Sequence, residues 1–118
     1  MTPVQPEIIQ HVEPIQMQQV TITPREAIET KIRAKFGKYG DYAVKIAQCE
    51  SGMNPKAIGD LHLDNGTNPS YGLLQIRYFG GARGTVEQLL DVDYNINKAY
   101  EMSGGGTNWQ PWSCSVII

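Results

Sequence analysis

Apolar residues recur at helical spacing soon after the proline-rich start of the chain. Ile28, Ile32 and Phe36 stand at i, i+4 and i+8, which places them on one face of a helix. The four residues at positions 23–26 are Thr-Pro-Arg-Glu, which supplies an N-cap, a proline at the first helical position and a capping-box glutamate. The pattern predicts a packing helix that starts there and ends at one of the glycines after Phe36.

A second helix is predicted from Tyr42 to Gly52, and most of its circumference is apolar. Four residues share one of its faces, at i, i+3, i+4 and i+7: Ala43, Ile46, Ala47 and Glu50. A helix this apolar is normally central rather than peripheral. A carboxyl group on its buried face loses hydration, which raises its pKa and suits it to general acid catalysis. The residues leave a second interpretation open, in which Glu50 reaches back to water from the helix end.

Residues 58–76 carry the pattern of a small β-hairpin. Asn65-Gly66 is a two-residue turn signal, and Tyr71 to Ile76 is the strand predicted after it. Three polar residues alternate before the turn: Asp60, His62 and Asp64. They alternate as metal ligands would, but they lack the glycine and the final acid that a calcium loop requires. We expect them to form the polar face of the hairpin, and we predict no metal site and no cofactor.

Thr85 is the expected N-cap of a further helix, which the pattern allows to be broken near Asp91. Its apolar face consists of Leu89, Val92, Ile96, Ala99 and Tyr100. The closing segment, Trp109 to Cys114, has no periodicity. We therefore expect its two indoles and Cys114 to anchor it to the rest of the domain.

The composition is that of one soluble domain. The chain has 118 residues, of which 41% are hydrophobic and 19% charged, enough for a single modest core. A formal net charge of −2 argues against nucleic acid as the main partner, and no apolar run is long enough to span a bilayer. Residues 1–22 are rich in Gln, Pro and Val, so we expect an extended tail or linker there, with a short strand over Ile15 to Ile22, followed by a domain over 23–118.

Four stretches form an ordered set: CESGMNPKAI (49–58), SYGLLQI (70–76), DVDYNINKAYEM (91–102) and WQPWSC (109–114). Together they resemble the catalytic domain of lytic transglycosylases, within the wider lysozyme-like superfamily. The first resembles the family's Glu-Ser followed by Asn-Pro and an alanine. The second resembles its Gly-Leu-Met-Gln-Ile segment, with Leu74 where methionine is common. The third resembles its Asp-x-x-x-Asn-Ile helix ending in Ala-Tyr, and the fourth is similar to the close of short secreted relatives. The resemblance covers about residues 40–114 and departs from the family at residues 59–69, which are longer than in compact members.

The resemblance implies an α+β, mainly α fold: a lysozyme-like domain with a central catalytic helix and a small β-hairpin. It makes Glu50 the general acid/base and places the glycan beside the hairpin. The implied substrate-binding residues are Ser51, Ser70, Tyr71, Gln75, Asn95 and Tyr100. Tyr100 would hydrogen-bond near Glu50, with core packing as the alternative, and a structural role is the alternative for Asn95. The same structural alternative holds for Ser51 and Ser70, while we expect Trp109 and Trp112 to cap the core rather than to stack on sugars.

For the reaction, the resemblance implies a peptidoglycan lytic transglycosylase. Such an enzyme cleaves the β-1,4 bond between N-acetylmuramic acid and N-acetylglucosamine and leaves 1,6-anhydro ends. Only Glu50 is placed by a motif, and with one acid the substrate can supply its own nucleophile. Two alternatives stay open. One is a lysozyme-type muramidase that uses Asp60 or Asp64 as a second carboxylate, and the other is a non-catalytic peptidoglycan-binding or signalling module.

The two cysteines bear on the compartment. A cysteine directly before the catalytic glutamate, paired with one at the domain's end, is similar to resuscitation-promoting factors, so the resemblance implies a disulfide between Cys49 and Cys114. The alternative is two buried free thiols in a cytoplasmic protein. Since disulfides persist in oxidising compartments, we expect extracytoplasmic action, secreted or in the cell wall or periplasm, with the export signal or anchor absent from this chain. The expected partner is the peptidoglycan glycan strand, and we expect a monomer.

Overall fold

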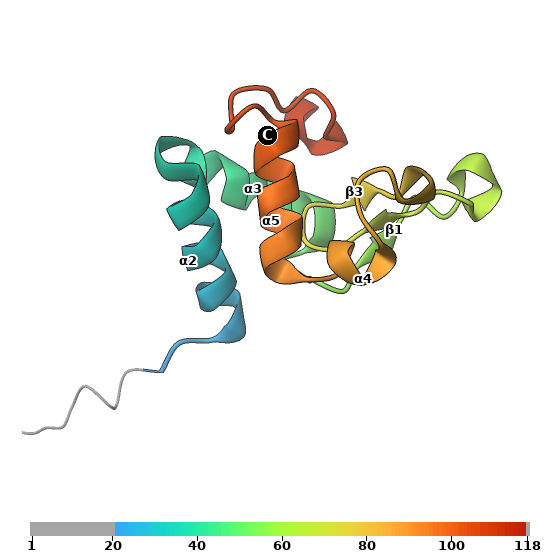
Figure 1. Cartoon of the computed structure of the whole chain (residues 1–118). Coiled ribbons are helices and arrows are strands. Elements are labelled where there is room, and N and C mark those ends of the chain that lie inside the picture. Colours follow the sequence, from blue (N-terminus) through green and yellow to red (C-terminus); the bar gives the residue numbers. More distant parts are fainter. Residues whose placement is uncertain (1–20, 118) are drawn as a thin grey trace, which may run out of the picture.

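The computed structural model describes residues 21–117, and it is mainly helical with one small sheet. The α-helices are α2 (Pro24–Phe36), α3 (Gly40–Ser51), α4 (Val86–Leu89) and α5 (Val92–Met102). The strands are β1 (Ile58–Gly59), β2 (Ser70–Tyr71) and β3 (Ile76–Arg77). Short 3₁₀ turns lie at η2 (Gly37–Tyr39), η3 (Leu63–Gly66), η4 (Phe79–Gly81) and η5 (Ser113–Val116). In Figure 1, α2 lies on one side of α5 and the strands lie on the other, with α3 running behind α5.

The predicted fold class, α+β and mainly α, is therefore confirmed. The predicted tail over residues 1–22 and its strand over Ile15 to Ile22 fall outside the described residues, except for residues 21 and 22. Those two belong to no helix or strand.

The first helix, α2, begins as its sequence predicts. The backbone N–H of Glu26 donates to Thr23 Oγ1 at 3.1 Å, and the N–H of Thr23 donates to Glu26 Oε1 at 3.0 Å. This reciprocal pair satisfies two N–H groups that the start of a helix otherwise leaves without partners. Ile32 and Phe36 turn into the core, where they are 0% and 3% exposed.

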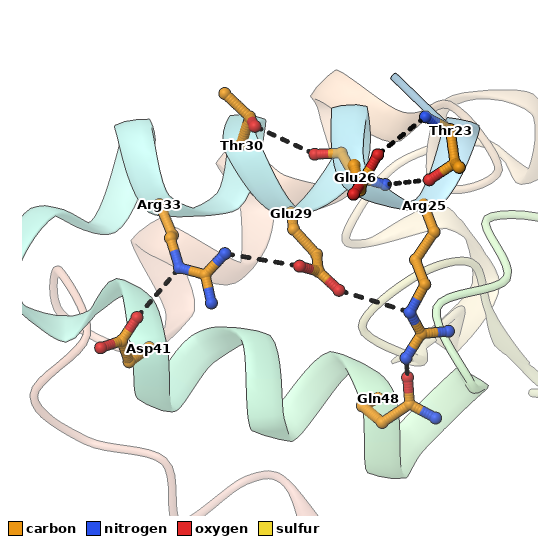
Figure 2. Close-up of polar contacts among 8 residues, drawn as sticks. All are labelled: Thr23, Arg25, Glu26, Glu29, Thr30, Arg33, Asp41 and Gln48. Atoms are coloured by element: carbon orange, nitrogen blue, oxygen red, sulfur yellow. Dashed lines mark hydrogen bonds and ion pairs between the residues drawn. The ribbon is translucent and has the colours of Figure 1, made fainter. Parts of the chain in front are cut away.

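A polar network joins the outer surface of α2 to α3 (Figure 2). The Glu29 carboxylate lies between Arg25 Nε at 3.3 Å and Arg33 NH1 at 3.4 Å. Arg33 Nε also reaches Asp41 at 2.9 Å, and Arg25 donates to the side chain of Gln48. Exposed pairs of this kind each contribute about 0–1 kcal/mol, so the network orients α2 more than it stabilises the fold.

The helix α3 is the centre of the core. Ala43, Ile46 and Ala47 are fully buried on the face that the sequence predicts. Gly52 ends the helix in the left-handed conformation at φ 65°, which glycine adopts without steric cost. The helix is thus confirmed, and Glu50 lies in its last turn.

The sheet differs from the predicted hairpin. The strand predicted over Tyr71 to Ile76 is wrong, because these residues form the ends of β2 and β3 and the turn that joins them. Gly72 at φ 83° and Gln75 at φ 48° cannot continue a strand. The turn also buries both Leu73 and Leu74 completely, whereas a strand would place them on opposite faces.

The Asn65-Gly66 pair is not a hairpin turn either. It belongs to η3, inside the longer loop that connects β1 to β2. Three successive residues, Asp64 to Gly66, have positive φ, one more than a type I′ turn contains. The sheet is consequently a three-stranded antiparallel one in the order β1-β2-β3, with Ser70 opposite both Gly59 and Arg77.

Buried polar side chains tie the helices to this sheet. Asn95, fully buried on α5, accepts a hydrogen bond from the N–H of Leu74 at 2.8 Å. Its Nδ2 donates to the carbonyl oxygens of Tyr71 at 3.0 Å and Leu89 at 2.7 Å. One side chain on α5 thus satisfies three backbone groups, which lie in β2, in the β2–β3 turn and in α4.

The predicted break near Asp91 is confirmed. Thr85 caps α4 with a capping box, and Asp91 caps α5 by accepting from the N–H of Tyr94 at 2.9 Å. The closing segment covers the core, as expected: Trp109 is 7% and Trp112 is 3% exposed. The indole N–H of Trp112 donates to the carbonyl of Leu74 at 2.8 Å, so the end of the chain is bound to the β2–β3 turn.

Candidate active site

A cleft of about 200 Å³ opens beside the end of α3. It is lined by Glu50, Asp60, Leu63, Ser70, Gln75, Arg77, Pro111, Trp112 and Ser113. Glu50 comes from α3, the next five residues come from the sheet and the connections between its strands, and the last three come from the closing segment. The cleft therefore forms only when three distant parts of the chain meet.

Glu50 has the features of a proton donor. Its carboxyl is half-buried, and burial raises the pKa of Glu50 above its ordinary value of 4.5. The N–H of Cys114 donates to Glu50 Oε2 at 3.1 Å and acts on that pKa in the opposite direction, while the charge of Asp60 adds to the rise. The net shift is upward, in the direction predicted from the sequence.

Asp60 is the second carboxylate of the cleft. It adopts φ 58°, an uncommon backbone conformation for a residue with a side chain, and it accepts a hydrogen bond from the hydroxyl of buried Ser70. Because Ser70 belongs to β2, this bond fixes the loop carboxylate against the sheet. Asp64, the other acid named from the sequence, instead pairs with Arg77 at 2.6 Å.

Gln75 lines the cleft and is held by the backbone around it. Its Nε2 donates to the carbonyl oxygens of Ala57 at 3.1 Å and Gly72 at 3.0 Å. Its Oε1 lies so close to Gly59 that a β-carbon there would stand 2.3 Å from it. Glycine at position 59 is thus what lets the amide pack against β1.

Four other predicted substrate-binding residues do not line this cleft. Ser51 donates to the carbonyl of Ala47 at 3.0 Å, and Tyr71 packs edge-on against Tyr78 at a ring distance of 6.1 Å. Asn95 is buried and holds the β2–β3 turn to α5, as described above. Tyr100 packs edge-on against Phe36 at 5.4 Å, and among the described residues it makes no hydrogen bond to Glu50.

Four lining residues were missed by sequence reasoning: Leu63, Arg77, Pro111 and Ser113. Arg77 stands two residues after Gln75, a spacing that would have placed the two on one face of an extended strand. Pro111 and Ser113 flank Trp112 in a segment without periodicity. The expected link between Cys49 and Cys114 was the one indication that this segment lies beside Glu50.

The structure contains that link. Cys49 and Cys114 form a disulfide with their Cα atoms 6.1 Å apart, joining α3 to η5. The residue before Glu50 is therefore bonded to the residue whose N–H contacts the Glu50 carboxylate.

A larger hollow of about 370 Å³ lies between α2 and α5. Lys31, Lys35 and Asp93 line it, and Lys31 is already paired with Asp93 at 2.9 Å. Its lining carboxylate, Asp93, is exposed, whereas the Glu50 carboxyl is half-buried, so the cleft at Glu50 is the better candidate for chemistry. Within residues 21–117, no group of His, Cys, Asp or Glu is placed to hold a metal ion. None of the helices in that range combines the length and apolarity needed to cross a membrane.

A mainly helical domain with a small three-stranded antiparallel sheet beside a cleft is consistent with a lysozyme-like α+β fold. Comparison with protein families agrees, because the model of the lysozyme-like domain family matches residues 31–114. The chain belongs to this family, as a lysozyme-like domain of the lytic-transglycosylase type, and the family is one of enzymes that act on peptidoglycan. Comparison with curated proteins and with solved structures gives no match.

Proposed function

We propose that this chain is a peptidoglycan lytic transglycosylase in which Glu50 acts first as the general acid and then as the general base. The observation that carries the proposal is the half-buried Glu50 carboxyl, which lines the cleft with a raised pKa. A carboxyl of this kind keeps its proton closer to neutral pH, as protonation of a glycosidic oxygen requires.

In the proposed reaction, Glu50 protonates the oxygen of the β-1,4 bond between N-acetylmuramic acid and N-acetylglucosamine. The N-acetyl group of the muramyl sugar stabilises the positive charge that develops at C1. The Glu50 carboxylate then accepts the proton of the 6-hydroxyl, whose oxygen bonds to C1 and closes a 1,6-anhydro ring. No water is consumed. We assign Ser70 and Gln75 to glycan contact or to positioning, because both line the cleft.

A second candidate is a lysozyme-type hydrolase, and Asp60 is the observation that favours it. Asp60 lines the same cleft, and its charge raises the pKa of Glu50. A hydrolase needs a second carboxylate, about 5–5.5 Å away to act as nucleophile or about 6.5–9.5 Å away to activate water. The hydrogen bond from Ser70 fixes the Asp60 carboxylate against β2, which supports a positioning role instead.

Mass spectrometry of digested peptidoglycan glycan separates these reactions. The transglycosylase gives products lighter by one water than the reducing-end products of a hydrolase. We expect the anhydro products from the native chain and loss of cleavage by about 10²–10⁴ in Glu50→Gln. Glu101→Gln, an exposed charge-neutralising change on α5, is the matched control.

Asp60→Asn tests the second carboxylate. We expect it to keep most of the activity, as should Asp64→Asn on the same loop. Reducing-end products from the native chain, together with inactivity of Asp60→Asn alone, would replace the transglycosylase by the hydrolase. Substantial turnover by a folded Glu50→Gln protein would remove Glu50 from either mechanism.

We also propose that the enzyme works outside the cytoplasm. The substrate class of the family lies there, and the Cys49–Cys114 disulfide is of the kind that oxidising compartments maintain.

A further inference from the structure

Apart from the hollow between α2 and α5, a second hollow, of about 230 Å³, adjoins the cleft at Glu50. The two share Gln75, Arg77, Pro111 and Trp112 as lining residues. The second hollow adds Ile76, Phe79, Arg83 and Met102. A ligand bound at Glu50 can therefore extend into it without leaving the surface of the protein.

The second hollow is positively charged. Among its lining residues in the described part of the chain, two are arginines and none is acidic. The charge of Arg77 is already used, since its Nε donates to the carbonyl of Asn68 at 2.6 Å and its NH2 pairs with Asp64. The Arg83 guanidinium makes no hydrogen bond or ion pair within residues 21–117. It is the free cation of this hollow.

Aromatic and backbone contacts hold Arg83 in place. Its guanidinium lies over the Phe79 ring, 4.8 Å from the ring centre. Its carbonyl accepts from the Tyr94 hydroxyl at 3.0 Å, so the backbone is anchored to α5. Phe79 itself adopts φ 44° and leaves 44% of its surface exposed, both of which are unfavourable for an aromatic residue. Strained residues of this kind gather at binding sites, where the surrounding fold imposes them.

We propose that Arg83, oriented by Phe79, binds a carboxylate carried by the muramyl sugar of the substrate, and so selects muramyl glycans over neutral ones. The proposal rests on the proposed function, because it places that sugar in the cleft at Glu50. A guanidinium presents donors in a fixed fork that matches a carboxylate. The muramyl sugar can offer two sources of this group. A peptide-free strand has the carboxylate of its lactyl ether, and a peptide-bearing strand has the carboxylates of its stem peptide.

Binding measured by calorimetry tests the proposal without requiring turnover. Three ligands are titrated into Glu50→Gln protein: a peptide-free GlcNAc-MurNAc tetrasaccharide, the same tetrasaccharide with stem peptides, and neutral chitotetraose. Each titration is repeated with three proteins that carry a second substitution beside Glu50→Gln: Arg83→Gln, Arg83→Lys or Arg25→Gln. Arg25 lies on α2 and lines neither the cleft at Glu50 nor the second hollow. Its substitution is therefore the matched control for losing one positive charge.

We expect Arg83→Gln to weaken the muramyl ligands about tenfold, the loss of one charge-assisted hydrogen bond at a partly exposed site. Arg83→Lys should restore part of that affinity, and chitotetraose should bind equally to all variants. Added salt should weaken muramyl binding more with Arg83 present than with Gln in its place. A tenfold loss on the peptide-free ligand assigns the lactyl carboxylate, and a loss on the peptide-bearing ligand alone assigns the stem peptide.

Other outcomes overturn the proposal. An equal loss on chitotetraose would mean that Arg83 only shapes the cleft, and equal affinities for Arg83→Gln and Arg25→Gln would mean that it contacts no carboxylate. Absence of muramyl binding in every variant would also remove the subsite. Failure of the proposed function looks different: muramyl ligands would bind in an Arg83-dependent way while the native chain cleaved no glycan.

Discussion

The disulfide makes the sharpest stability prediction, and Cys49→Ala is the change that tests it. Cys49 is exposed on α3, so alanine there removes the bond without opening a cavity. The bond spans a sequence separation of 65 residues. For a loop of that size, the chain-entropy model gives about 4 kcal/mol of stabilisation. This is a large fraction of the roughly 5–15 kcal/mol by which a native domain is stable.

Urea unfolding measures the effect. With a denaturant slope of about 1–3 kcal/mol per molar, a loss of 4 kcal/mol lowers the unfolding midpoint by roughly 1.3–4 M. The native chain treated with a reductant should unfold at the same midpoint as Cys49→Ala. Lys45→Ala, also exposed on α3, is the control and should change the free energy of unfolding by less than about 0.5 kcal/mol. If Cys49→Ala shifts the midpoint no more than Lys45→Ala does, the closed loop contributes nothing and the reasoning fails.

Two further predictions concern Glu50 and Asn95. Because burial raises the pKa of Glu50, cleavage should decline as the pH rises through that pKa and the acid form disappears. The raised pKa of Glu50 also makes the free energy of unfolding depend on pH. Below the unfolded-state pKa the carboxyl is protonated in both states and costs no stability, and as the pH rises through the folded-state pKa the buried carboxyl ionises and stability is lost. Glu50→Gln should therefore unfold at a higher urea concentration than the native chain at neutral pH, and at the same concentration well below pH 4.5; equal midpoints at every pH would contradict the buried carboxyl. Asn95→Ala removes three hydrogen bonds and leaves the Leu74 N–H unsatisfied, so the free energy of unfolding should fall by about 3 kcal/mol, while exposed Asn97→Ala should leave it nearly unchanged.

The helices could be predicted from the sequence because the information that sets them is local. Thr23 and Thr85 each have the residues of their capping box within three positions, and Gly52 directly follows the last turn of α3. Helical spacing also places Glu50 on the buried face of α3, but it leaves open whether the carboxyl reaches back to water, and the structure shows it half-buried. The sheet could not be predicted in the same way, since its strands are only two residues long and no alternation develops in so short a run.

The residues that line the cleft were also hard to predict from the sequence, because they come from segments without a local pattern. Pro111 and Ser113 lie more than 60 positions from Glu50 in a segment without periodicity, and in the sequence the expected pairing of Cys49 with Cys114 was the one link between that segment and Glu50. Arg83 stands in a glycine-rich stretch, residues 80–84, that has no hydrophobic periodicity. Its contacts with Phe79 and Tyr94 depend on positive φ angles in that stretch, and no pattern of residue types reports those angles.

The bond between Trp112 and Leu74 has a consequence for motion. It joins the two walls of the cleft, since Trp112 belongs to the closing segment and Leu74 to the β2–β3 turn. Asn95 holds the same turn to α5. The hydrogen bonds of Trp112 and of Asn95 to this turn are both buried. A hinge that opened the cleft would have to break them away from water, where an unmade hydrogen bond is costly. The cleft is therefore preformed, and a ligand has to fit its existing shape rather than induce its closure.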